Sequence, residues 1–496
     1  MRPDRRKFLR DTLCSALGGA GLYSALGSLQ LIQAATRGGY AFDDYKALVC
    51  VFMYGGNDSF NSVVPYTQSA FDAFYGNNGV RPALALSRGD LHPLTAPSSG
   101  AGSPGDGNTY ALHPDMPELA NVFNAGKAAI IANVGTLVAP TTQAQYLAGA
   151  VALPPQLYSH ADQTSYWQSS PPSNAPVTGW GGRIADLVAS ANPAGVPILT
   201  GLNSQDVFIR GQTQNGYVMN SSSAATVIFP YDPGDGLQAQ FNALFAANTQ
   251  ANALERTFAA TMNHSMATSS VINAAIAAAP TFETFFPNPT GYDLDTQLQT
   301  VAQLIWAASN NVPGYAGLKR QVFFVNAGGY DTHNDELAQH LDLLPLLSKS
   351  LAGFYNALAN VGLANAATLF TASDFGRTMT SNDGGTDHGW GSHHFVVGGA
   401  VAGGKFYGNG CGFSGQDANY GLVMPSLLNP TSTTDGSSPN LNDSGDGYGR
   451  LIPTTSVDQY AATLAHWFDL HPSDIGLLFP NLANFSNPAN YLGFMG

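Results

Sequence analysis

The fold class of this chain is decided by residues 47–58, which read ALVCVFMYGGND. The first eight residues of this stretch are apolar without a break, and two glycines, an asparagine and an aspartate follow them. An apolar run of this length is typical of a strand that is buried on both faces of a parallel sheet. The stretch therefore predicts a central strand over 47–54 with a polar loop at its carboxyl end.

Similar apolar runs recur along the chain and alternate with helical patterns. The runs lie at 128–134, 196–200, 321–326, 367–372 and 395–397. The helical patterns lie at 116–125, 182–190, 237–257, 294–309, 336–359 and 458–468. Strands and helices in alternation are typical of an α/β domain. The sequence therefore predicts a doubly wound α/β fold with a mostly parallel sheet.

Two stretches depart from this alternation. Residues 201–311 are rich in Ala, Asn and Gln and contain no clear strand, which predicts a helical insertion or cap. Residues 414–455 are rich in Gly, Ser, Asp, Asn and Pro, a composition typical of a long surface loop. We expect one domain over residues 36–496 that carries both.

Residues 1–35 have the layout of an export signal. Arg5 and Arg6 belong to a basic segment, and a mildly apolar stretch rich in Gly and Ala follows over 13–32. Paired arginines before such a stretch are typical of the twin-arginine route. We therefore predict that the twin-arginine translocase delivers the chain to the periplasm or beyond, with no membrane span in the mature part. A retained anchor is the alternative, because about 20 apolar residues span a bilayer.

The composition restricts the partners of the protein. Hydrophobic residues make up 44% of the chain, charged residues only 10%, and the formal net charge is −14. Phosphate contacts require Lys and Arg, so this balance argues against non-specific binding of nucleic acid. Cys50 lies in the first apolar run, which favours a buried free thiol, and a disulfide with Cys411 is the alternative.

Three of the apolar runs end in an aspartate. Asp58 follows the first run, Asp331 follows 321–326, and Asp374 follows 367–372. Ligands of an open parallel sheet bind beyond the carboxyl ends of the strands, so we expect these acids in one crevice. Neighbouring carboxylates repel one another unless a cation neutralises them. The alternative is that each aspartate only caps the helix that follows it.

Histidines accompany these acids. His333 lies two residues after Asp331, and His388 follows Asp387 in the segment GTDHG. Oxygen and imidazole ligands together suit Zn, Mn, Mg or Fe. The sequence therefore predicts a divalent metal site, and its candidate ligands are Asp58, Asp331, His333, Asp374, Asp387 and His388.

Segments over nearly the whole mature chain carry a family resemblance. The longest is 52–65, FMYGGNDSFNSVVP, and the most specific are 328–333, GGYDTH, 373–377, SDFGR, and 385–389, GTDHG. Together they resemble the DUF1501 family of exported bacterial proteins, which is related in fold to the alkaline phosphatase and sulfatase superfamily. The resemblance implies an alkaline phosphatase-like fold, while the activity of DUF1501 proteins is not established.

The superfamily relation implies a hydrolase with one or two metal positions at the strand ends. There a Ser, a Thr or a modified Cys attacks phosphorus or sulfur. By this resemblance Asp58 and Asp374 match metal-binding acids that follow two strands. Asp331 with His333 matches the Asp/His pair of the other metal position, and His388 resembles the histidine that completes the ligand set.

The chain also departs from the superfamily pattern. Phe375 stands where a histidine usually follows the late-strand aspartate, and the pair formed by Asp331 and His333 is more closely spaced than usual. A Cys-x-Pro-x-Arg motif is absent from the sequence, which excludes the formylglycine of sulfatases. These departures set the chain apart from the superfamily at its metal positions.

Ser159 is the candidate nucleophile, because it follows the second strand, where the superfamily resemblance implies a nucleophile, and precedes residues 160–168, a predicted helix whose amino end would stabilise an alkoxide. A plain helix cap is the alternative for Ser159, and Ser62 is a rival nucleophile four residues after Asp58. Arg377 is the candidate clamp for a substrate oxyanion, or else the structural partner of Asp383.

Two functions therefore compete. The first is an exported metal-dependent hydrolase of phosphate or sulfate esters, or of a related anionic group on a small molecule or polymer. The second is a non-catalytic periplasmic or surface module that keeps the fold and a degenerate metal site. The retained acids and histidines favour the hydrolase, and Phe375 favours the binding module.

Overall fold

The structure is a computed structural model that describes residues 33–35, 39–170, 177–193, 195–226, 236–246, 251–286, 293–408, 423–430, 438–485 and 491–496. Nearly all of the predicted signal peptide lies outside these residues. Cys50 is a buried thiol, and Cys411 lies outside the described residues. None of the described helices is long and apolar enough to cross a membrane.

A mixed, mostly parallel sheet of nine strands forms the centre of the molecule, in the order β11-β5-β10-β9-β1-β8-β6-β7 with β12 beside β5. Its strands are β1 (Lys46–Met53), β5 (Ala128–Gly135), β6 (Leu199–Leu202), β7 (Tyr217–Met219), β8 (Arg320–Ala327), β9 (Ala367–Ser373), β10 (Ser392–Gly398), β11 (Lys405–Tyr407) and β12 (Thr455–Ser456). Only β10 runs antiparallel to its neighbours, β5 and β9. The predicted α/β class is confirmed.

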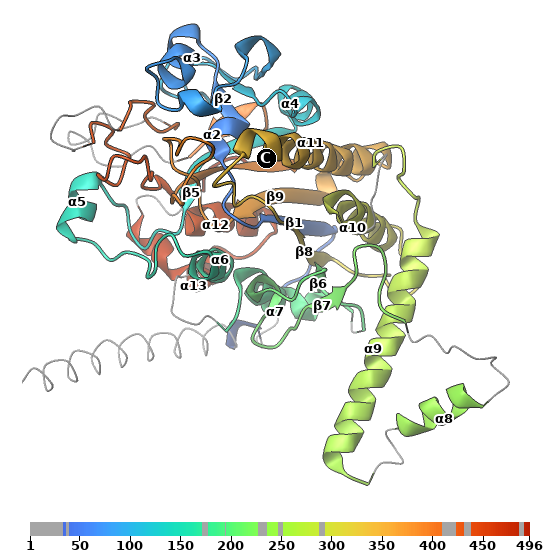
Figure 1. Ribbon diagram of the computed structural model, residues 1–496. Coiled ribbons are helices and arrows are strands. Elements are labelled where there is room, and N and C mark those ends of the chain that lie inside the picture. The colour runs from blue at the N-terminus through green and yellow to red at the C-terminus, as the bar shows by residue number, and fades with distance from the viewer. Residues whose placement is uncertain are drawn as a thin grey trace, which may run out of the picture.

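Helices cover both faces of this sheet, with α10 and α11 on one side and α7, α12 and α13 on the other (Figure 1). The described helices are α2 (Ser59–Ser62), α3 (Gln68–Tyr75), α4 (Pro117–Asn124), α5 (Gln143–Ala148), α6 (His160–Ser169), α7 (Trp180–Val188), α8 (Leu237–Leu244), α9 (Ala253–Ala278), α10 (Leu294–Ser309), α11 (Glu336–Asn360), α12 (Val457–Trp467) and α13 (Pro472–Leu478). A small antiparallel sheet contains β2 (Val63–Pro65), β4 (Tyr110–Leu112) and β3 (His92–Pro93).

Strand β1 shows why an unbroken apolar run was needed at the centre. Val49 and Val51 pack into the core on the side of α10 and α11, while Leu48 and Phe52 pack into the core on the side of α7 and α12. Successive side chains of a strand point to opposite faces, so a strand covered on both sides needs apolar residues at every position.

The predicted insertion at 201–311 is only partly helical. It contains β7, a strand of three residues that extends the sheet edge beside β6 and is too short to give a periodic signal. The single helix expected at 237–257 is two helices, α8 and α9, because the side chain of Asn252 accepts a hydrogen bond from the Leu254 amide and starts a new helix. Both helices lie to one side of the main body (Figure 1).

The expected surface loop at 414–455 is buried in its second part. Residues 409–422 and 431–437 lie outside the described residues, but Asn440, Asn442 and Asp443 have exposed fractions of 0–2%. The carboxylate of Asp443 accepts the amide hydrogens of Gly445, Gly447 and Gly449. Polar side chains here satisfy backbone groups, so a polar composition does not require exposure.

Candidate metal centre

The loops that follow three neighbouring parallel strands meet at one edge of the sheet. Strand β1 lies between β8 and β9, and all three point the same way. They end just before Gly55, Asp331 and Asp374 respectively. The amide of Gly55 donates a hydrogen bond to Asp374 Oδ2 over 3.1 Å. Of the three acids expected to meet here, the structure thus brings Asp331 and Asp374 to one edge of the sheet.

Two glycines allow the β1 loop to pass beneath this edge. Gly55 and Gly56 have φ angles of +117° and +84°. A Cβ on Gly55 would lie 2.3 Å from the Asp331 amide nitrogen, and one on Gly56 would lie 2.6 Å from the Phe375 ring. Any other residue at position 55 would therefore displace the Asp331 backbone, and any other residue at position 56 would displace the Phe375 ring.

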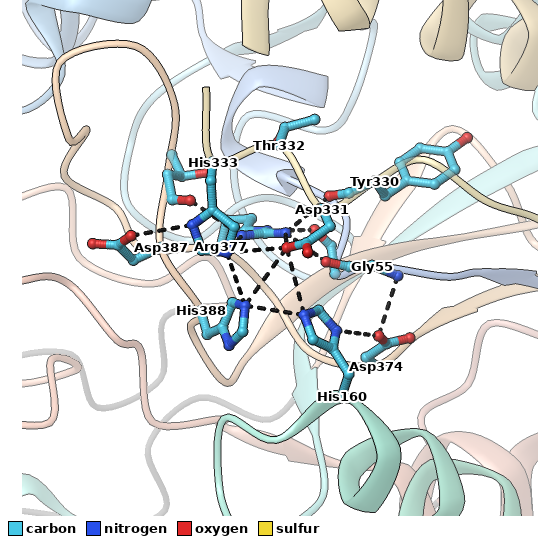
Figure 2. A network of polar contacts seen from close by, with 12 residues as sticks. Gly55, His160, Tyr330, Asp331, Thr332, His333, Asp374, Arg377, Asp387 and His388 are labelled. Carbon is cyan, nitrogen blue, oxygen red and sulfur yellow. Dashed lines mark hydrogen bonds and ion pairs between the residues drawn. The ribbon is translucent and has the colours of Figure 1, made fainter. Parts of the chain in front are cut away.

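Three imidazoles surround one carboxylate oxygen (Figure 2). Asp331 Oδ1 lies 3.4 Å from His160 Nε2, 3.1 Å from His333 Nε2 and 3.5 Å from His388 Nε2. His388 Nε2 in turn lies 3.0 Å from both His160 Nε2 and His333 Nε2. Four ligand atoms of the kinds that bind transition metals are thus packed side by side.

Each of these imidazoles has an oxygen acceptor at its other nitrogen. His160 Nδ1 lies 2.7 Å from Asp374 Oδ2, His388 Nδ1 lies 2.8 Å from the Tyr158 carbonyl oxygen, and His333 Nδ1 lies 3.3 Å from Asp387 Oδ1. A carbonyl oxygen can only accept, so the partners assign the proton of each neutral ring to Nδ1. Each Nε2 then carries a lone pair directed at its neighbours, and that of His333 also accepts from Arg377 Nη1 over 3.4 Å.

Lone pairs at these distances repel unless a positive charge lies between them. The hydrogen bond to Asp374 raises the pKa of His160. Burial lowers the pKa of His388, and the charge of His160 contributes to the same shift. Burial acts against ionisation of Asp331, but its bond to Arg377 holds the pKa of that carboxyl below the usual value. An ionised carboxylate and a basic Nε2 thus attract a proton or a metal cation to one point.

The geometry fits a metal ion. His160, Asp331 and His388 offer ligand atoms that all lie within 4.8 Å of one another. Metal–ligand bonds of 2.0–2.1 Å in a tetrahedral zinc site place ligand atoms about 3.3–3.4 Å apart. The separations here are 3.0, 3.4 and 3.5 Å. Ligating histidines also commonly donate their second N–H to a carboxylate or a backbone carbonyl, as these do.

Arg377 connects the backbone of the loops that carry the site. Its side chain is fully buried and donates to the carbonyl oxygens of Gly55, Gly56, Tyr330 and Thr386 and to Asp331 Oδ1. Its ion-pair partner is therefore Asp331 rather than Asp383. A role as clamp for a substrate oxyanion stays a prediction, and all three guanidinium nitrogens already donate to protein groups.

Asp58 lies outside the cluster of imidazoles. Its side chain is fully buried and forms an ion pair with Arg81 over 2.5 Å. Its Oδ1 accepts from the amide of Phe60, so it caps the short helix α2. The cap alternative thus describes Asp58. Asp374 and Asp387 instead accept from the Nδ1 atoms of His160 and His333. Asp331, His333 and His388 lie in the cluster itself.

The two candidate nucleophiles are bonded within their own segments. Ser159 precedes α6 as expected, but its hydroxyl donates to Asp162 Oδ2 over 2.6 Å and caps no backbone amide. Ser62 is fully buried, and its hydroxyl donates to the Asp58 carbonyl oxygen over 3.0 Å. Ser159 as a nucleophile stays a prediction, and burial keeps Ser62 from a substrate.

His160 is the site residue that the sequence analysis missed. It is the first residue of α6, directly after Ser159. It follows no apolar run directly, so the search for polar residues at strand ends passed over it. The signal was its position beside the candidate nucleophile at the start of a helix.

An open pocket of about 510 Å³ lies beside the cluster. Its lining residues are Tyr54, Gly55, His160, Ala161, Thr164, Asp331 and Asp374. This volume lies within the range of small-molecule sites, about 300–1,000 Å³. A ligand in the pocket would contact the His160 and Asp331 side of the cluster.

Comparisons with known proteins identify a family. The model of the family described as "Protein of unknown function (DUF1501)" matches residues 45–432. A search of curated proteins found no match. Among solved structures, the lipoteichoic acid synthase LtaP from Listeria monocytogenes is similar at 8% sequence identity, with a TM-score of 0.29, over 75% of this chain and 71% of that one. A TM-score this low does not establish a shared fold.

Proposed function

This chain belongs to the DUF1501 family, and we propose that it binds one divalent metal ion and uses it to hydrolyse a phosphate or sulfate ester, or a related anionic group. The observation that carries the proposal is the meeting of three Nε2 atoms at Asp331 Oδ1, with every Nδ1 already bonded to an oxygen. His160, Asp331 and His388 would hold the ion, because three protein ligands leave room for water or a substrate, and His333 would lie beside them with its Nε2 3.4 Å from Arg377 Nη1.

A bound divalent ion would supply Lewis acidity, which polarises an ester oxygen and lowers the pKa of water. The protein contributes the arrangement around it. Asp374 fixes the ring of His160, and Tyr158 fixes the ring of His388 through its carbonyl oxygen. Arg377 keeps Asp331 ionised at the point where the imidazoles meet. The pocket beside His160 leaves one side of the centre open to a substrate.

We propose a single metal position because an aromatic ring lies against the centre. The Phe375 ring lies 4.7 Å, between centroids, from both the His160 and the His388 rings. An apolar ring offers no ligand, and it excludes water from that side of the imidazoles. The doubly wound, alkaline phosphatase-like topology and export by the twin-arginine translocase to the periplasm or beyond belong to the same proposal.

One observation favours the second candidate, a non-catalytic binding module. None of the seven residues that line the pocket, all within the described part of the chain, is Lys or Arg. An anionic substrate would depend on the metal for its positive counter-charge. A module that binds a ligand through the metal alone needs no further cation.

The test begins with metal content. Protein purified after export, stripped with a chelator and reloaded separately with Zn, Mn, Mg or Fe, should retain one equivalent of the preferred ion by elemental analysis. His160→Ala and His388→Ala should each abolish that retention, because each removes a ligand of the cluster. His264→Ala is the matched control, since His264 is an exposed histidine on α9.

Activity separates the two candidates. The loaded protein should hydrolyse an activated aryl phosphate or aryl sulfate, and the His160→Ala protein should not. Metal binding without hydrolysis of either ester would select the binding module. Full metal content in both histidine variants would refute the centre itself.

A further inference from the structure

A buried glutamate joins the two loops that carry the metal-centre residues. Glu336, the first residue of α11, is fully buried. Its Oε2 accepts the hydroxyl of Thr332 over 3.0 Å and the hydroxyl of Thr386 over 2.7 Å. Thr332 separates Asp331 from His333 in the sequence, and Thr386 precedes the Asp-His pair of the second loop. One oxygen atom thus holds both loops.

The backbone strengthens the same connection. The amide of Thr386 donates to the Thr332 carbonyl oxygen over 3.1 Å, and the amide of Glu336 donates to the Gly384 carbonyl oxygen over 3.0 Å. The Thr332 side chain points away from the imidazoles (Figure 2). Glu336 therefore lies behind the cluster, where it can fix the loops without contacting a ligand atom.

Resting on the proposed metal centre, we propose that Glu336 is a positioning residue, which sets the separation of Asp331, His333 and His388 by holding Thr332 and Thr386 on one carboxyl oxygen. The two loops have no common strand or helix, and their spacing decides whether the Nε2 atoms meet at Asp331. A centre whose loops are free to separate binds metal more weakly, because the ligands must be ordered when the ion binds.

The surroundings of Glu336 identify it as a neutral acid. Its carboxyl group lies beside that of Asp58, and two neighbouring carboxyl groups resist ionising together. Arg81 holds Asp58 ionised, so the proton belongs to Glu336. Burial and the charge of Asp58 raise the pKa of Glu336 to about 9. Glu336 can then donate to Asp58 from one oxygen and accept both threonine hydroxyls on the other.

A second metal site at this place is the alternative, since Asp58, Glu336 and His340 are all buried there. Asp58, Glu336 and His340, however, are not among the described residues that bring three ligand atoms within 4.8 Å of one another, as His160, Asp331 and His388 do. Arg81 already neutralises Asp58. The polar group around Glu336 therefore supports the centre rather than forming another.

The test compares variants of the whole protein with Zn²⁺ and Co²⁺ as probes. Glu336→Ala removes the acceptor, and we expect the dissociation constant for Zn²⁺ to rise about 10–100-fold, as for other groups behind metal ligands. Glu336→Gln keeps a carbonyl oxygen for the threonines and an N–H for Asp58, and should stay within about threefold of wild type. The visible spectrum of the Co²⁺ protein should change in the alanine variant only.

Asp295→Ala is the matched control. Asp295 is a buried acid of α10 that accepts the hydroxyl of Ser350, farther along the same helix as Glu336. Its loss weakens packing without touching the loops, so the Zn²⁺ affinity and the Co²⁺ spectrum should not change. Thr332→Val combined with Thr386→Val leaves Glu336 unchanged but removes both hydroxyls that donate to it. This double variant should reproduce the loss of Zn²⁺ affinity.

The outcomes are distinct. Wild-type protein that binds neither ion refutes the metal centre itself. Wild-type binding with unchanged affinity and spectrum in both Glu336→Ala and the double threonine variant refutes the positioning role alone. A loss of binding in Glu336→Gln as large as in Glu336→Ala, or two equivalents of Zn²⁺ in wild type, would make Glu336 a ligand and overturn the inference.

Discussion

Replacing Asp374 tests whether it binds metal directly or acts through His160. The sequence places Asp374 at a strand end as a candidate ligand, but its Oδ2 accepts from His160 Nδ1 over 2.7 Å and from the Gly55 amide over 3.1 Å. Its side chain is 2% exposed. We therefore expect Asp374→Asn and Asp374→Ala to weaken metal binding in steps, without changing the number of ions bound.

The size of each step follows from the lost hydrogen bond. A hydrogen bond to a charged group is worth about 1.5–3 kcal/mol, and one between neutral groups about 0.5–1.5 kcal/mol. The asparagine keeps an acceptor for His160 but loses the charge, a difference of about 1–1.5 kcal/mol, which is about tenfold in the dissociation constant. The alanine loses the whole bond, so binding should weaken by up to about 100-fold.

The assay is competition for Zn²⁺ against a chelator of known affinity, combined with the visible spectrum of the Co²⁺ protein. Asp162→Asn is the matched control, because Asp162 lies on the same helix as His160 and its carboxylate accepts from Ser159 instead of an imidazole. Unchanged affinity in Asp374→Ala would show that Asp374 does not act on His160. Loss of the bound ion in Asp374→Asn, with a changed Co²⁺ spectrum, would make Asp374 a ligand.

Four other substitutions address separate parts of the molecule. Ser159→Ala should keep its metal, because the hydroxyl is bonded to Asp162 of its own helix, and should lose turnover if Ser159 is the predicted nucleophile; turnover within about threefold of wild type would contradict that role. Asp58→Ala should lower the free energy of unfolding in urea by about 3–5 kcal/mol by leaving a buried arginine unpaired, and a neutral result would contradict that role. In metal-free protein, the free energy of unfolding should fall between about pH 5 and 9, by at most about 1.4 kcal/mol per pH unit. The reason is that Glu336 keeps its proton in the folded state and loses it in the unfolded state, so Glu336→Gln should reduce this slope. Arg5→Lys with Arg6→Lys should leave the precursor in the cytoplasm, and its normal appearance outside would reject the twin-arginine route.

The central strands could be predicted because burial on both faces leaves a direct mark on the sequence. The runs at 128–134, 321–326 and 367–372 correspond to β5, β8 and β9 within one residue at each end. The run at 196–200 contains Pro197, which cannot donate to the ladder, and β6 begins only at Leu199. The antiparallel direction of β10 has no such mark, because pairing partners are set by the tertiary fold.

The candidate site was predictable where it follows the strands, and unpredictable where it depends on contacts across the chain. Asp331, His333 and His388 were found from local motifs. His160 and Asp374 are 214 residues apart in the sequence, and their hydrogen bond has no local signal. Arg81 and Arg377 decided the rest, because Arg81 pairs with Asp58 and Arg377 with Asp331, and no spacing rule predicts these pairs.

Charge balance connects these assignments to the number of metal ions. Asp331, Asp374 and Asp387 surround the imidazoles, and Arg377 is the guanidinium that contacts this group. Three carboxylates against one guanidinium leave two negative charges when the imidazoles are neutral. One divalent cation at the Nε2 atoms cancels them. A second would leave two uncompensated positive charges beside the fully buried Arg377 and an aromatic ring. Because Asp58 is already neutralised by Arg81 and adds no charge to this balance, the arrangement favours one ion.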